Sequence, residues 1–161
     1  MVVTGLVAVL GAVVTLTVAL VTANNTREQA AEEFQREQRQ KAYVELVAAN
    51  DKFGGALRDL WYAHDLQAPF EESKQGQAFV ELTAAGREFG LKSSLVHLVS
   101  PPDTAMAAAD LSDSNIDLQQ MVLDRITGGT TPQTQQAFDA GMVRSINLEI
   151  DFMSFARKDL D

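Results

Sequence analysis

One uncharged stretch near the start of the chain, VVTGLVAVLGAVVTLTVALVTA from Val2 to Ala23, restricts the possible folds more than any other feature. It contains neither a charged residue nor a proline. At a helical rise of about 1.5 Å per residue, its length matches the hydrocarbon core of a bilayer, which is about 30 Å thick. Because lipid offers no partners for backbone N–H and C=O groups, a segment that crosses it alone must be helical. We therefore expect residues 1–25 to form a single transmembrane helix.

Two other interpretations fit this stretch less well. A cleaved signal peptide has a basic segment before a shorter apolar core. Nothing basic precedes this run, although Val21-Thr22-Ala23 has residues suited to a cleavage site. A buried helix of a soluble domain would show a polar face, and this stretch carries no charged residue on any side.

The charges that flank the stretch predict its orientation. Only the amino group of Met1 precedes it, whereas four basic residues follow it: Arg27, Arg36, Arg39 and Lys41. Lys and Arg near the end of a span favour the cytoplasmic side of the membrane. We expect a single-pass protein of the inner (cytoplasmic) membrane whose C-terminal domain lies in the cytoplasm.

Small residues recur along the stretch at spacings of three and four, which places them on one side of a helix. This small-residue stripe consists of Gly5, Ala8, Ala12, Thr15, Ala19 and Thr22. Packing holds helices together in lipid, and small side chains let two backbones approach closely. The stripe is either a packing face for a partner helix or the ordinary Gly, Ala and Thr content of a membrane span, and the sequence leaves both open.

Residues 26–42 (TREQAAEEFQREQRQKA) differ sharply from the stretch before them. Their charges alternate in sign, and Phe34 is the only large apolar residue among them. Pairs such as Glu32 with Arg36 stand four residues apart in the order that supports a helix. We expect a charged, solvated helical stalk here.

Residues 43–161 contain four long patterns in which apolar residues recur every three or four positions, as on the buried face of a helix. A polar link at 71–77, Ser100-Pro101-Pro102-Asp103 and the 128–132 segment separate the patterns. These features predict an all-α fold with an up-down-up-down four-helix bundle domain at 43–161. The expected buried positions include Leu46, Asn50, Phe53, Trp61, Phe79, Leu82, Phe89, Met106, Ile116, Phe138, Ile146, Phe152 and Phe155.

Composition argues against several classes of chemistry. The formal net charge of −9 lies entirely outside the uncharged stretch, so the domain is repelled by nucleic acid. The absence of cysteine excludes disulfides and thiol chemistry. Bundle di-metal sites use Glu-x-x-His, but Trp61 and Ser94 stand three residues before His64 and His97. We expect no catalytic residues, no cofactor and no metal.

Five aspartates follow one side of the third predicted helix, four of them at intervals of seven residues. This acidic ridge consists of Asp103, Asp110, Asp113, Asp117 and Asp124, with Arg125 as the only basic residue nearby. It is either a solvated face that keeps the domain soluble or a docking surface for a basic patch on a partner, where complementary charge aids specificity.

The order of apolar helix, Glu/Arg/Gln-rich stalk and helical domain resembles small single-span membrane proteins of actinobacteria. Among these it is most similar to an accessory subunit of the mycobacterial MCE lipid-import ABC transporter. The resemblance implies a non-enzymatic scaffold subunit in an integral membrane protein complex with a transporter permease. A second hypothesis is a membrane-tethered bundle that senses or binds a small apolar ligand, with a cavity lined by the phenylalanines at 79, 89, 138, 152 and 155.

Overall fold

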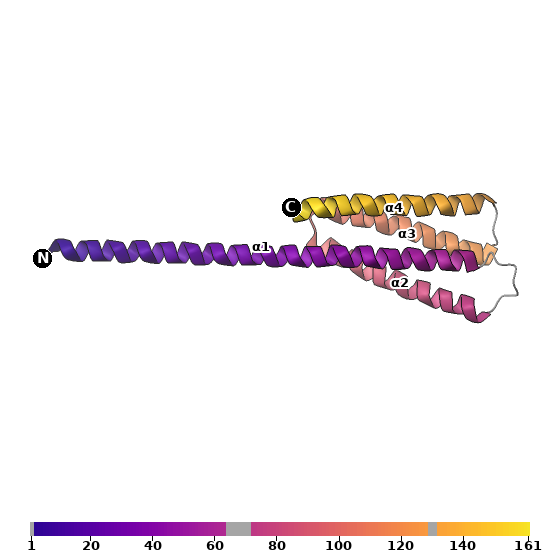
Figure 1. The fold of residues 1–161 in the computed structure, drawn as a ribbon, viewed down its shortest axis with the longest axis horizontal. Coiled ribbons are helices and arrows are strands. Elements are labelled where there is room, and N and C mark those ends of the chain that lie inside the picture. Colours follow the sequence, from indigo (N-terminus) through magenta and orange to yellow (C-terminus); the bar gives the residue numbers. More distant parts are fainter. Residues whose placement is uncertain (1, 64–71, 129–131) are drawn as a thin grey trace. The chain divides into compact units, whose positions relative to one another are not determined.

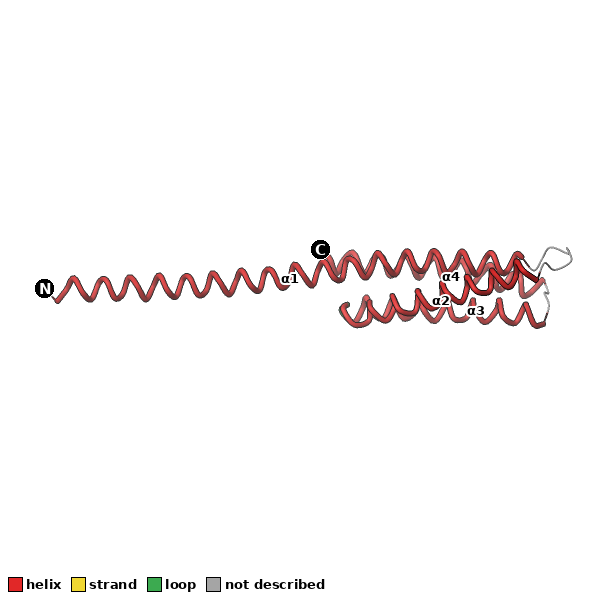
Figure 2. The backbone as a smooth tube through the Cα atoms, turned by 90° about the horizontal axis from the view of Figure 1, so that it is seen from below, coloured by secondary structure: helices red, strands yellow, loops and turns green. Residues whose placement is uncertain are grey.

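The computed structural model describes the backbone of residues 2–63, 72–128 and 132–161, and the side chains of residues 26–63, 76–126 and 133–161. Within these ranges it consists of four α-helices and no strand, which confirms the predicted all-α class (Figure 1; Figure 2). The helices are α1 (Val2–Ala63), α2 (Glu72–Val99), α3 (Pro102–Gly128) and α4 (Pro132–Leu160).

The chain divides into two compact units, Met1–Glu37 and Gln38–Asp161. In the first unit, every side chain from residue 26 to residue 37 is exposed. The predicted transmembrane helix at 1–25, with its small-residue stripe, lies outside the residues whose side chains are described. In the described part of the chain, no helix is both long and apolar enough to cross a membrane.

Ion pairs show how α1 and α2 run in the second unit. Lys52 Nζ lies 2.6 Å from Glu88 Oε2, and Lys92 Nζ lies 2.9 Å from Glu45 Oε2. Residues later in α1 therefore meet residues earlier in α2, so the two helices are antiparallel. α2 ends at Val99 and α3 begins at Pro102, so the turn between them is short.

Aromatic contacts show that α4 is also antiparallel to α1. Tyr43 meets the ring of Phe152 edge-on at 5.7 Å between ring centroids. Trp61, later in α1, stacks on Phe138, earlier in α4, at 3.9 Å and 3° between ring planes. Edge-to-face pairs such as Tyr43–Phe152 add stability beyond the area that they bury.

Apolar side chains from all four helices form one core in this unit, which is therefore a helical bundle. Its largest fully buried members are Trp61, Phe53, Phe138, Phe152, Leu46, Leu57, Leu60, Leu82, Leu111, Leu118, Val96 and Val122. α2 begins earlier than the sequence predicted, because residues 72–77, expected as a polar link, are helical. Polar side chains such as Glu, Gln and Lys are compatible with a helix, so polarity alone did not mark a break.

Several residues expected in the core are instead exposed: Phe79 (46%), Met106 (61%), Ile116 (61%), Ile146 (54%) and Phe155 (36%). On α3 the reason is the composition of its inward face. That face includes the buried small residues Ala107, Ala108 and Ser114, so the size of a side chain does not indicate which face of the helix points inward.

Phe152 is completely buried, whereas Phe155 on the same helix is 36% exposed. We expect Phe152→Ala to lower the free energy of unfolding by about 3–5 kcal/mol, because it removes buried ring surface and leaves a cavity. Phe155→Ala, the matched control, should cost clearly less, about 1–2 kcal/mol, because part of this ring is already exposed. Urea denaturation followed by circular dichroism measures both values, and equal losses for the two variants would contradict the burial pattern.

Candidate functional site

Four polar side chains form a continuous hydrogen-bonded network inside the bundle, here called the core polar network. Ser145 Oγ donates to Asn115 Oδ1 at 2.9 Å, and Asn115 Nδ2 donates to Asn50 Oδ1 at 2.6 Å. Asn50 Nδ2 then donates to Glu149 Oε2 at 2.6 Å. The two asparagines and the serine are at most 6% exposed. Because an unsatisfied buried polar group is costly, these bonds constrain how α1, α3 and α4 are aligned.

Glu149 is the only ionisable member of this network, and it is half-buried. Burial raises the pKa of its carboxyl group, the bond from Asn50 opposes that shift, and the nearby charge of Asp51 adds to it. The sequence placed Asn50 in the core, where polar residues often fix register, and Asn50 is indeed buried. Asn115 was missed, although its spacing from Leu111 and Leu118 marks the same buried face.

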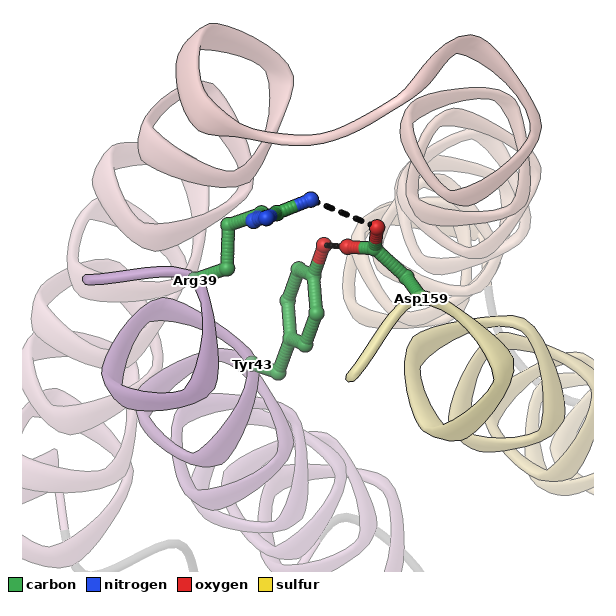
Figure 3. Close-up of polar contacts among 3 residues, drawn as sticks. All are labelled: Arg39, Tyr43 and Asp159. Atoms are coloured by element: carbon green, nitrogen blue, oxygen red, sulfur yellow. Dashed lines mark hydrogen bonds and ion pairs between the residues drawn. The ribbon is translucent and has the colours of Figure 1, made fainter. Parts of the chain in front are cut away.

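A second polar cluster joins α1 to the end of α4, and Figure 3 shows its three side chains meeting. Arg39 Nη1 lies 2.7 Å from Asp159 Oδ1, and the Tyr43 hydroxyl donates to the other carboxylate oxygen of Asp159. Burial, together with the bond to Asp159, raises the pKa of Tyr43 to about 12. Arg39, which the sequence analysis placed in the stalk, belongs to the second unit and holds this cluster.

Arg125, expected from the sequence as a basic neighbour of the acidic ridge, is buried. It is 2% exposed, and its guanidinium carbon lies 4.2 Å from the centroid of the Trp61 ring. Gln135 Oε1 accepts hydrogen bonds from Trp61 Nε1 at 2.7 Å and from Arg125 Nη1 at 3.4 Å. A planar guanidinium stacks well on an aromatic face. Arg125 therefore packs in the core against Trp61 and is not part of the charged surface of the bundle.

The acidic ridge lies on the surface, because all five aspartates (Asp103, Asp110, Asp113, Asp117 and Asp124) are exposed. Asp124 accepts a hydrogen bond from Gln120 Nε2 at 2.7 Å. This exposure fits both interpretations of the ridge, so partner docking through it stays a prediction.

A cleft of about 440 Å³ opens between α2 and α3. Its lining residues come from three helices: Phe53 of α1; Gly86, Phe89, Gly90, Ser93, Ser94 and His97 of α2; and Ala109, Ser112, Asp113, Asn115, Ile116 and Gln119 of α3. The Ser93 and Ser112 hydroxyl groups share a hydrogen bond of 2.7 Å. The cleft was not predicted from the sequence. The small residues that line it on α2 and α3, such as Gly86, Gly90 and Ala109, were the signal that could have indicated it.

The phenylalanines proposed to line a ligand cavity do not lie together. Phe89 lines the cleft, whereas Phe138 stacks on Trp61 and Phe152 packs against Tyr43. Phe79 and Phe155 are exposed. The suggested five-phenylalanine cavity is therefore wrong as a single site.

Among the residues that the structure describes, no group of three or more His, Cys, Asp or Glu side chains could hold a metal ion. Comparison with known protein families, with curated proteins and with solved structures finds no match for this chain.

The raised pKa of Tyr43 predicts how stability depends on pH. Above about pH 10 the unfolded chain loses the phenol proton, whereas the folded protein keeps it until about pH 12. The unfolded state then binds fewer protons, so the free energy of unfolding should fall as pH rises from about 10 to about 12. In Tyr43→Phe, the decrease in the free energy of unfolding that comes from the Tyr43 phenol should be absent.

Tyr62, which is 47% exposed, provides the matched control. Urea titrations at several pH values measure the free energy of unfolding of each variant. Between about pH 10 and about pH 12 it should decrease as much in Tyr62→Phe as in the wild type, and less in Tyr43→Phe. At neutral pH, Tyr43→Phe should cost about 1.5–3 kcal/mol for the lost hydrogen bond to a carboxylate. An undiminished alkaline fall in Tyr43→Phe would contradict the raised pKa of Tyr43.

Proposed function

We propose that this protein is a non-enzymatic accessory subunit of a multi-subunit inner-membrane complex, held in the membrane by residues 1–25. The uncharged stretch from Val2 to Ala23 is the observation that carries the proposal, because it is long enough to span a bilayer as a helix. The exposed side chains of residues 26–37 and the separate compact unit that begins at Gln38 are compatible with a domain tethered through a stalk.

In this proposal, the small-residue stripe packs against a helix of the partner. Close approach is favoured where Gly, Ala and Thr face the partner, since packing rather than hydrophobicity drives association in lipid. The basic residues that follow the span support a cytoplasmic location for the bundle. There the acidic ridge adds a second contact, with a basic surface of the complex.

The partner that we propose is the permease of an MCE-type lipid-import ABC transporter. The support is the shared plan of a span, a charged stalk and a helical domain, which resembles the accessory subunits of that transporter. A subunit of this kind contributes scaffolding and has no catalytic residues of its own.

The small-residue stripe can be tested by enlarging one of its members. Ala12→Leu keeps the stretch apolar, so the protein should still reach the membrane, but the larger side chain pushes two packed helices apart. We expect this variant to lose the complex that co-purifies with the wild type after gentle solubilisation. Leu10→Ile, away from the stripe, is the control and should retain that complex.

Two results would reject docking through the stripe. One is equal retention of the complex by Ala12→Leu and Leu10→Ile. The other is purification of the wild-type protein alone from native membranes.

A further inference from the structure

The walls of the α2–α3 cleft are built from small side chains on both helices. Gly86 packs closely, since a Cβ added there would lie 3.0 Å from the Phe53 ring. At Gly90, by contrast, an added Cβ would meet nothing within 4 Å. Glycine weakens a helix interior relative to alanine, and no packing contact requires it at Gly90. Gly90 provides open space in a cleft that Ala109 and Ser112 of α3 also line.

Two largely covered aromatic rings form the base of this cleft. Phe53 is 2% exposed and Phe89 is 5% exposed, and their rings stack at 5.8 Å between centroids and 10° between planes. Ile116 adds an exposed apolar side chain to the lining. The volume of about 440 Å³ falls within the range of small-molecule sites, about 300–1,000 Å³.

The polar side chains that line the cleft determine which polar groups a bound apolar ligand should carry. The Ser93 and Ser112 hydroxyl groups and the Gln119 amide can exchange hydrogen bonds with a ligand. Asp113 is the only carboxylate of the lining, and His97 is its only other titratable side chain. With one fixed negative charge in a protein of net charge −9, the cleft favours cations over anions.

We propose that the cleft between α2 and α3 binds a small aromatic amine, with its ring against Phe53 and Phe89 and its ammonium group paired with Asp113. The site shares Asp113 with the acidic ridge, but it does not depend on the membrane anchor or the small-residue stripe of the function proposed above. Apolar contact supplies most of the affinity, and the exposed Asp113 contributes a modest preference for the charged amine.

The test is fluorine NMR of 5-fluorotryptamine titrated with the full-length protein in detergent micelles, with empty micelles as the blank. Its matched anion is 5-fluoroindole-3-acetate. Gly90→Leu fills the cleft from α2, and Gly76→Leu is the control on the same helix, since a Cβ at Gly76 also meets nothing within 4 Å and Gly76 lies outside the cleft. Ala109→Leu fills the cleft from the opposite wall and replaces Gly90→Leu if that variant does not fold.

We expect the wild type to bind the amine about fivefold more tightly than the anion. Gly90→Leu should remove amine binding to the level of empty micelles, Gly76→Leu should leave it unchanged, and Asp113→Asn should abolish the preference for the amine. The proposal is overturned if the wild type binds no amine beyond the micelle blank, if the anion binds as well as the amine, or if the cleft-filling variants bind like Gly76→Leu. None of these outcomes bears on the co-purification test of the small-residue stripe.

Discussion

The hydrogen bonds of the core polar network constrain the bundle more than any other interaction in it. Asn50 accepts from Asn115 and donates to Glu149, so a single side chain of α1 is bonded to both α3 and α4. Apolar side chains tolerate small shifts along a helix, but directional bonds between buried amides do not. A helix that slipped by one turn would bury unsatisfied polar atoms. The network therefore favours one alignment of three helices over its alternatives.

The other specific contacts of the bundle occupy different levels along α1. Tyr43 and Arg39 meet Asp159 near the C-terminus, and Trp61 meets Phe138 and the buried Arg125 towards the other end. Between α2 and α3, small residues such as Gly90, Ser94 and Ala109 line the cleft together with Phe53 and Phe89. The cleft lies next to the core polar network, since Asn115 belongs to both, and small residues such as Gly90 and Ala109 leave space there.

The all-α class could be predicted because it depends on local features of the sequence. These are the four stretches in which apolar residues recur every three or four positions, and the proline or glycine residues that separate them. Sequence periodicity placed Phe53, Trp61, Phe138 and Phe152 correctly in the core. It failed for Met106 and Ile116, because the inward face of α3 mixes small residues such as Ala108 with large ones such as Leu111, so side-chain size does not mark that face. The burial of Arg125 depends on Trp61 and Gln135, which other helices supply. Contacts between residues that are distant in sequence leave no local pattern.

Membrane tethering through residues 1–25 is the premise on which the proposed function depends. Extraction of membranes with alkaline carbonate tests it directly, because carbonate releases peripheral proteins and leaves membrane-spanning ones in the pellet. The full-length protein should stay in the membrane pellet, and a variant that lacks residues 2–25 should appear in the supernatant. Release of the full-length protein into the supernatant would contradict a transmembrane anchor and, with it, docking through the small-residue stripe.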